Sequence, residues 1–254
     1  MNNKYISKFM IEYIKNNNLK FIHIGKTGGT SISKQFQLTQ YHLQRNYKEN
    51  ETFIIWIRNP INRFVSAFNF QYNLIHTDTT KLDINNLTLE NCLAPQRIAY
   101  KMTHDHTFSK RYDYLINYFK TANELAESIS SENIEKKKLA LELMNSPIEH
   151  IFKGIGWYLY NGDFVRKNYH KIIFVGSCEN MNNDIKKLAG LLNTDIDENK
   201  KHLRKNIYNS NTFLSPKAIN NILHFYKDTD YKALQTLLEY NFITEELFHK
   251  YHHY

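Results

Sequence analysis

Cysteine is nearly absent from this chain. Cys92 and Cys178 are the only two among 254 residues, and neither has the spacing of a metal site. Small secreted domains that lack a large core need several disulfides, and two isolated cysteines give no such framework. The sequence therefore excludes a disulfide scaffold and a cysteine-based metal module.

Glycine, proline and long apolar runs are also scarce. With 8 Gly and 4 Pro, the chain has little room for long flexible linkers. Residues 1–18 are polar and broken by lysines, unlike a signal peptide, and no later run is apolar over the thickness of a bilayer. We expect a single cytoplasmic domain that covers residues 1–254, without a transmembrane segment.

Acidic residues are fewer than basic ones, so the chain is suited to anionic partners. The 33 Lys and Arg residues against 25 Asp and Glu residues give a net charge of +8. Apolar side chains make up 42% of the chain, enough for one substantial core. A phosphorylated nucleotide and an acidic glycan fit this charge, and so do nucleic acid and a membrane surface. Net charge alone does not choose among them.

A lysine-bearing, glycine-rich turn follows the first apolar segment. Residues 21–24 are typical of a buried strand and run straight into Gly25-Lys26-Thr27-Gly28-Gly29-Thr30-Ser31. The paired glycines let backbone N–H groups approach an anion, and a helix expected to begin near Thr30 adds its positive end. Lys26 supplies a full charge, and the three hydroxyl residues supply further donors. The pattern predicts a site for phosphate or sulfate.

This turn is not a complete Walker loop. In the motif G-x-x-x-x-G-K-[ST] the first glycine would stand at the position of Lys20, so only Gly25-Lys26-Thr27 match. The lysine also precedes the paired glycines of the turn. A magnesium-dependent kinase or ATPase is therefore disfavoured, although it shares the logic of the loop.

A second buried strand is predicted over residues 53–57, and it ends at Arg58-Asn59-Pro60. Asn59 is suited to cap a helix whose first residue is Pro60. Helical spacing then separates an apolar face from a polar face. The apolar face holds Ile61, Phe64, Val65 and Phe68, and the polar face holds Asn62, Arg63, Ser66 and Asn69. Arg58 and Ser66 are thus expected to converge on one ligand.

Taken together, the loop from Lys26 to Ser31, Arg58 and Ser66 resemble the cofactor motifs of sulfotransferases that use 3′-phosphoadenylyl sulfate (PAPS). The glycan-modifying branch is the most similar, and the resemblance covers residues 21–68. In that family the first loop binds the 5′-phosphosulfate, and an Arg and a Ser placed like Arg58 and Ser66 bind the 3′-phosphate. The resemblance implies an enzyme that moves a sulfuryl group to a hydroxyl, in the first place of a carbohydrate. The product nucleotide is then adenosine 3′,5′-bisphosphate (PAP), and no metal is required.

Animal members of this family are usually anchored in the Golgi membrane. The present chain departs from them because it shows no apolar anchor. We therefore expect a bacterial or viral version, or a chain trimmed of its anchor.

A weaker similarity to the same enzymes occurs at residues 172–181, where a strand ends in glycine and is followed by Glu179 and a helix. Glu179 is interpreted as a carboxylate at a helix N-terminus rather than a catalytic group. Similar enzymes then have a polar loop over the cofactor. Arg204 and Lys205 occupy that place here and are predicted phosphate contacts.

Several residues are candidates for the catalytic base, because the family uses either a His or a Glu. One often lies between the two cofactor motifs, where this chain has His42, Glu49 and Glu51. We choose His42, since an imidazole titrates near neutral pH and accepts a proton there. His104 and His106 are runners-up and are also candidate acceptor-binding residues. Lys26 is the expected catalytic cation at the leaving phosphate.

The order of strand and helix patterns indicates an α/β fold with a P-loop-like central parallel sheet flanked by helices. A helical insertion is predicted over about residues 74–150, with helices over 87–100, 114–129 and 133–144. The sheet resumes over 171–175, and helices follow over 216–226 and 231–240. Acceptor specificity is expected to lie in the insertion.

Two alternative functions fit parts of the pattern. A phosphotransferase that uses ATP and magnesium would explain the loop. A basic nucleic-acid-binding protein would explain the net charge but not the loop. We expect a nucleotide donor and a hydroxylated acceptor as partners, and no nucleic acid.

Overall fold

The computed structural model describes residues 18–41, 48–76, 107–146, 150–197 and 211–253. The chain divides into two compact units. Unit 1 comprises residues 1–63, 153–207 and 225–254, and unit 2 comprises residues 64–152 and 208–224. The prediction of one domain over 1–254 stays a prediction.

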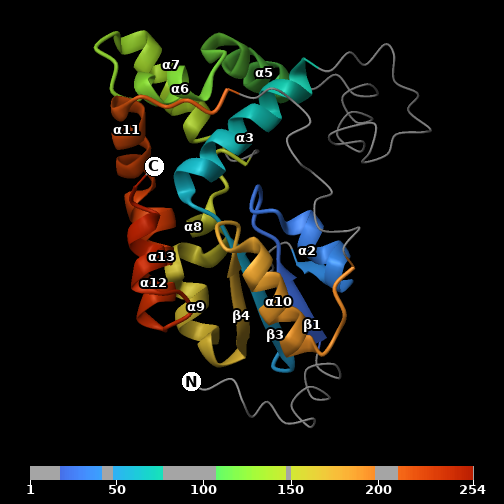
Figure 1. Ribbon diagram of the computed structural model, residues 1–254. Helices are drawn as coiled ribbons and strands as arrows, with labels where there is room; N and C mark the ends of the chain where they lie inside the picture. The colour runs from blue at the N-terminus through green and yellow to red at the C-terminus, as the bar shows by residue number, and fades with distance from the viewer. Residues whose placement is uncertain (1–17, 42–47, 77–106, 147–149, 198–210, 254) are drawn as a thin grey trace, which may run out of the picture. The chain divides into compact units, whose positions relative to one another are not determined.

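Unit 1 contains the strands and most of the short helices (Figure 1). Its strands are β1 (Asn18–Ile22), β2 (Thr39–Tyr41), β3 (Glu51–Ile57) and β4 (Ile172–Ser177). Its helices are α2 (Gly29–Phe36), α8 (Ile155–Leu159), α9 (Asp163–Asn168), α10 (Met181–Leu192), α12 (Lys232–Glu239) and α13 (Glu245–Lys250). Short helical turns occupy η3 (Tyr160–Gly162), η4 (Tyr169–Lys171) and the π-helical η6 (Lys227–Tyr231).

The four strands form one parallel sheet in the order β2-β1-β3-β4. The strand predicted over 53–57 is found within β3, and the strand predicted over 21–24 is found as β1, two to three residues nearer the N-terminus. β4 covers the strand predicted over 171–175 with a shift of one to two residues, and β2 was not predicted. All seven residues of β3 are buried, as expected of a central parallel strand. The predicted α/β class, a parallel sheet flanked by helices, is thus confirmed.

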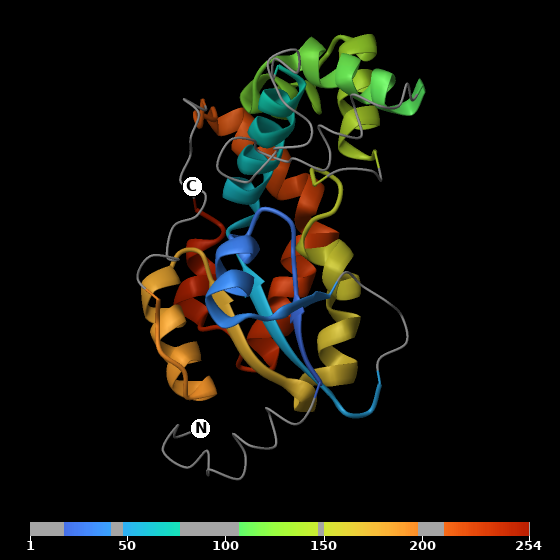
Figure 2. The ribbon, with the colours of Figure 1, turned by 90° about the vertical axis from the view of Figure 1, so that its right-hand side faces the viewer.

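Helices cover both faces of this sheet (Figures 1 and 2). On one face, Ile32 of α2 and Ile185 and Leu188 of α10 pack with residues of β1 and β3 in one apolar cluster. On the other face, the ring of Phe164 in α9 meets the ring of Phe53 edge-on, with centroids 5.1 Å apart. The alternation of side chains along β3 supplies both faces.

Unit 2 is helical in the described residues. It holds most of α3 (Pro60–Ile75), then α5 (Thr107–Phe119), α6 (Ala122–Ser128) and α7 (Ile134–Met144), and most of α11 (Pro216–Tyr226). The helices predicted over 133–144 and 216–226 are confirmed, and the helix predicted over 87–100 lies outside the described residues.

The single helix predicted over 114–129 is wrong, because the structure has two helices there. Lys120 has a left-handed φ of 56°, which ends α5. Thr121 then caps α6, since its side chain accepts a hydrogen bond from the Glu124 N–H at 3.0 Å. The spacing of Thr121 and Glu124 is that of a capping box, so this break could have been found in the sequence.

Within the described ranges, no helix combines the length and the apolar composition that a membrane span requires.

Candidate functional site

The chain order of the strands creates a switch point between β1 and β3. From β1 the chain crosses to β2 on one side, and it later enters β3 on the opposite side of β1. In open parallel sheets, ligands bind outside the carboxyl ends of the strands where the connections diverge in this way. Lys26 follows β1, and Arg58 follows β3 directly. The two predicted cations therefore flank the switch point.

The loop after β1 has a compact backbone that depends on its glycines. Lys26 and Gly28 both adopt left-handed conformations, with φ of 69° and 76°. A side chain at Gly28 would also meet the Met181 Cε atom at 2.8 Å. At Gly29 an added Cβ would overlap the ring of His23, so the start of α2 lies directly on the end of β1. Gly28 thus supplies a φ that residues with side chains rarely adopt, and Gly29 leaves room for the His23 ring.

Thr27 is fully buried and fixes the loop from inside. Its hydroxyl donates to the Ile24 carbonyl at 2.9 Å. Its own carbonyl accepts a bond from the Cys178 thiol at 3.0 Å, so the turn after β4 supports the loop. Burial raises the pKa of Cys178 to about 12, against a smaller opposing effect of Arg58, and the thiol thus stays a donor. Because a hydroxyl has a single proton, the Thr27 hydroxyl does not donate to an anion in this structure as predicted, and the Thr27 backbone N–H is the anion contact that stays a prediction.

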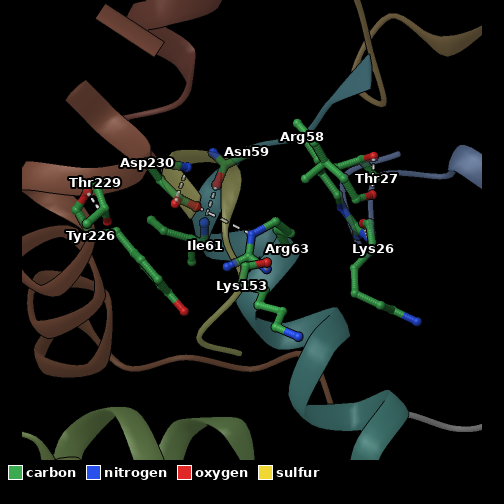
Figure 3. Close-up of polar contacts among 12 residues, drawn as sticks. Lys26, Thr27, Arg58, Asn59, Ile61, Arg63, Lys153, Tyr226, Thr229 and Asp230 are labelled. Carbon is green, nitrogen blue, oxygen red and sulfur yellow. Dashed lines mark hydrogen bonds and ion pairs between the residues drawn. The ribbon is translucent and has the colours of Figure 1, made fainter. Parts of the chain in front are cut away.

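Arg58 reaches back to the loop. Its Nη1 donates to the Lys26 carbonyl at 3.3 Å, which joins the two predicted cofactor motifs (Figure 3). Figure 3 shows the Lys26 side chain extending away from the loop backbone. The guanidinium and the ammonium thus come from adjacent strands to one edge of the sheet.

Helix α2 begins at Gly29, close to the predicted start near Thr30. Gly28 stands at its cap position and has no side chain to accept from the first N–H groups. These groups and the positive end of the helix can therefore serve an anion. Thr30 and Ser31 lie half-buried on the first turn of this helix.

The N-terminus of α3 is fixed by a network of polar contacts. Asn59 caps the helix as predicted, because its Oδ1 accepts from the N–H groups of Ile61 at 2.8 Å and of Asn62 at 3.2 Å. The Asn59 N–H in turn donates to Glu179 at 3.0 Å, and the Tyr251 hydroxyl donates to the same carboxylate at 2.7 Å. Glu179 therefore serves the start of α3, whereas the sequence suggested the helix that follows Glu179.

Arg63 corrects the predicted pattern of α3. The spacing placed it on the polar face, but its side chain is fully buried. Its Nε lies 3.4 Å from the Asp230 carboxylate, which is 1% exposed, and the guanidinium lies 5.4 Å from the centre of the Tyr226 ring. Asp230 also accepts from the Gly156 N–H at 2.8 Å. Sequence reasoning missed this pair because its members are far apart along the chain.

The two alternative bases, Glu49 and Glu51, lie at the amino end of β3, whereas Arg58 follows its carboxyl end. Glu51 is the first residue of β3, is buried and accepts from the Lys48 N–H at 3.1 Å. Arg58 follows the last residue of this strand, so the strand places the two roughly 20 Å apart. Glu51 is therefore too far from Arg58 to act as the base beside it. Glu49 lies two residues before Glu51, at the same amino end of β3, and is excluded for the same reason.

The remaining predicted residues are placed only in part. Ser66 lies in α3 within unit 2, so its distance from Arg58 stays a prediction. The other candidates lie outside the described residues: His42, His104, His106, Arg204 and Lys205. Tyr41, immediately before His42, pairs with Ile22, so β2 ends at the same edge of the sheet as β1.

A scan against models of protein families found no match, and neither did comparisons with curated proteins and with solved structures.

Proposed function

We propose that this protein is a sulfotransferase that moves the sulfuryl group of PAPS to a hydroxyl of a carbohydrate acceptor. The contact between the Arg58 guanidinium and the Lys26 carbonyl carries the proposal. It brings the two motifs of the sulfotransferase resemblance together at a switch point, where parallel sheets bind nucleotides.

The proposal assigns the donor to a P-loop-like site. The 5′-phosphosulfate lies on the backbone of residues 27–29, on Lys26 and on the hydroxyls of Thr30 and Ser31. Arg58 and Ser66 bind the 3′-phosphate, and Arg204 and Lys205 cover the nucleotide. Arg58 suits this role because a guanidinium offers several donors in a fixed plane.

In the reaction, the acceptor oxygen attacks sulfur and the bond from sulfur to the 5′-phosphate oxygen breaks. The products are a sulfate ester and PAP, and the acceptor proton goes to His42, the proposed base. Negative charge grows on the leaving phosphate during this step. Lys26 stabilises that charge. Electrostatic stabilisation of this kind is usually the largest single contribution that a protein makes to such transfers.

Two features favour this proposal over an ATP-dependent kinase. In a Walker loop the hydroxyl after the lysine binds magnesium, but the Thr27 hydroxyl donates inward to Ile24. Nucleotide triphosphatases also place an aspartate on a neighbouring strand to hold the metal. Here β3 is followed by Arg58, a cation that attracts a further phosphate rather than a metal.

Calorimetric titration tests the proposal. PAP is expected to bind with micromolar affinity and more tightly than ADP with magnesium. Arg58→Ala should weaken PAP binding at least about tenfold, the typical effect of losing a charged hydrogen bond. Arg111→Ala is the matched control, since Arg111 is exposed in unit 2 and pairs with Glu142. Absence of PAP binding, or a preference for ADP with magnesium, would overturn the proposal.

A further inference from the structure

Lys153 and Trp157 form a cationic and aromatic pair in unit 1. The Lys153 Nζ lies 5.1 Å from the centre of the Trp157 ring, within the range of a cation–π contact. Trp157 is 38% exposed, whereas the other tryptophan, Trp56, is fully buried. An indole and an ammonium are thus presented together on the surface.

The backbone that carries this pair is held firmly. The Lys153 carbonyl accepts from the buried Arg63 guanidinium at 3.4 Å. The next residue, Gly154, is packed so closely that an added Cβ would overlap the Asp230 carboxylate, and Gly156 is packed in the same way on the backbone of Thr229. The pair therefore stands on a segment with little freedom to move, which suits a preorganised binding surface.

The same segment lies beside the anion loop. The buried Tyr158, adjacent to Trp157, is hydrogen-bonded to the backbone of Gly25, the residue before Lys26. In Figure 3 the amines of Lys26 and Lys153 extend in the same direction. A molecule on the Lys153 and Trp157 pair would thus be next to the site proposed for the donor.

The chemistry of the pair selects a particular ligand. The C–H face of a sugar ring is apolar and packs on an indole, which is large, rigid and partly wet. An ammonium beside the indole forms a charge-assisted hydrogen bond with a carboxylate. The indole alone suits any sugar ring, and the ammonium alone suits any carboxylate. An acidic sugar carries both groups and therefore fits the pair.

We propose that Lys153 and Trp157 form the acceptor subsite for an acidic sugar, with a uronic acid ring packed on Trp157 and its carboxylate bound by Lys153. This inference rests on the proposed sulfotransferase function, and it names the acceptor of that same site. It adds two residues next to the donor loop to a specificity that the sequence placed in the helical insertion.

Tryptophan fluorescence gives a direct measurement. Because Trp56 is buried, quenching by acrylamide reports mainly on Trp157. The probes are an oligosaccharide of alternating uronic acid and N-acetylhexosamine and its analogue with the carboxylates reduced to alcohols. With PAP present, the acidic oligosaccharide should protect the fluorescence from acrylamide, and the reduced analogue should bind about tenfold more weakly.

Variants separate the two contributions, with affinities measured by calorimetry. Lys153→Met should weaken binding of the acidic oligosaccharide about tenfold and leave the reduced analogue unchanged. Trp157→Ala should weaken both, and Trp157→Phe should retain most of the affinity because it keeps an aromatic face. Lys167→Met is the charge-matched control, since Lys167 is exposed on α9 of the same unit. It should behave like the unmodified chain.

The outcomes distinguish the two proposals. If PAP binds and the oligosaccharide does not protect Trp157, the subsite is refuted and the donor assignment stands. If the oligosaccharide protects Trp157 and PAP does not bind, the saccharide site is supported and the sulfotransferase proposal fails. Equal losses from Lys153→Met and Lys167→Met would also refute the subsite.

Discussion

Replacing Arg63 by methionine is expected to destabilise the protein strongly. The change keeps the apolar stem but removes the charge that faces Asp230, and both side chains are almost completely buried. Among the described residues, the hydrogen bond that Asp230 would then keep is the one from the Gly156 N–H. An uncompensated carboxylate in such a place costs about 3–5 kcal/mol. The melting temperature should fall by roughly 6–20 °C, since a chain of this size loses about 2–4 °C per kcal/mol.

Urea denaturation followed by far-UV circular dichroism measures this cost. Lys187→Met is the control, because the Lys187 side chain is 64% exposed and its partner Asp184, 3.6 Å away, keeps the Ser177 N–H and hydroxyl as donors. The control should change the free energy of unfolding by less than about 0.5 kcal/mol.

A double variant then isolates the charge effect. Arg63→Met/Asp230→Asn removes both charges, and the amide oxygen can still accept from Gly156. It should be at least about 1.5 kcal/mol more stable than Arg63→Met alone. The reasoning fails if Arg63→Met costs no more than the control, or if the second substitution adds a further loss.

Three further changes test the loop. Lys26→Ala should lower sulfuryl transfer at least about 100-fold while the circular dichroism spectrum stays unchanged, and normal turnover would exclude its catalytic role. Gly29→Ala should lower the urea midpoint by the equivalent of about 1–3 kcal/mol, because the methyl group overlaps the His23 ring. Alkylation of Cys178, followed by peptide mass spectrometry, should be slow in the folded protein, because burial raises the pKa of this thiol from 9.0 to about 12. Unfolding should speed the alkylation, and equal rates in both states would contradict the burial. Because the unfolded thiol ionises first, the free energy of unfolding should fall as pH rises from 9.0 towards 12.

Local signals made three strands of the sheet and the loop predictable, but not the three-residue β2. The apolar runs of β1 and β3, the glycines after β1 and the Asn59-Pro60 cap each act within a few residues, and each is found in the structure. The position of Arg58 at the carboxyl end of β3 follows from the strand pattern, whereas its role in phosphate binding was inferred from the resemblance and stays a prediction. Its contact with Lys26 joins residues that are 32 positions apart.

Contacts between distant segments were not predictable from one sequence. The pattern of α3 treats every charged residue as exposed. Burial of Arg63 becomes favourable through distant groups, which include the Asp230 carboxylate from the π-helical turn after α11 and the Lys153 carbonyl. Glu179 likewise gains its role from Asn59, which is 120 residues away. The contact between Lys153 and Trp157 was not predicted, because a four-residue spacing outside a long helix gives no periodic pattern in the sequence.

The network at the start of α3 has a consequence for biosynthesis. Asn59 is held by Glu179 and by the carbonyl of Tyr251, which are 120 and 192 residues further along the chain. When the loop and Arg58 of a nascent chain have emerged from the ribosome, the groups that hold Asn59 in place have therefore not yet been synthesised. Contacts over such separations form late, because closing the intervening chain costs entropy first. The anion affinity proposed for this loop should thus be among the last properties that the protein acquires as it is made.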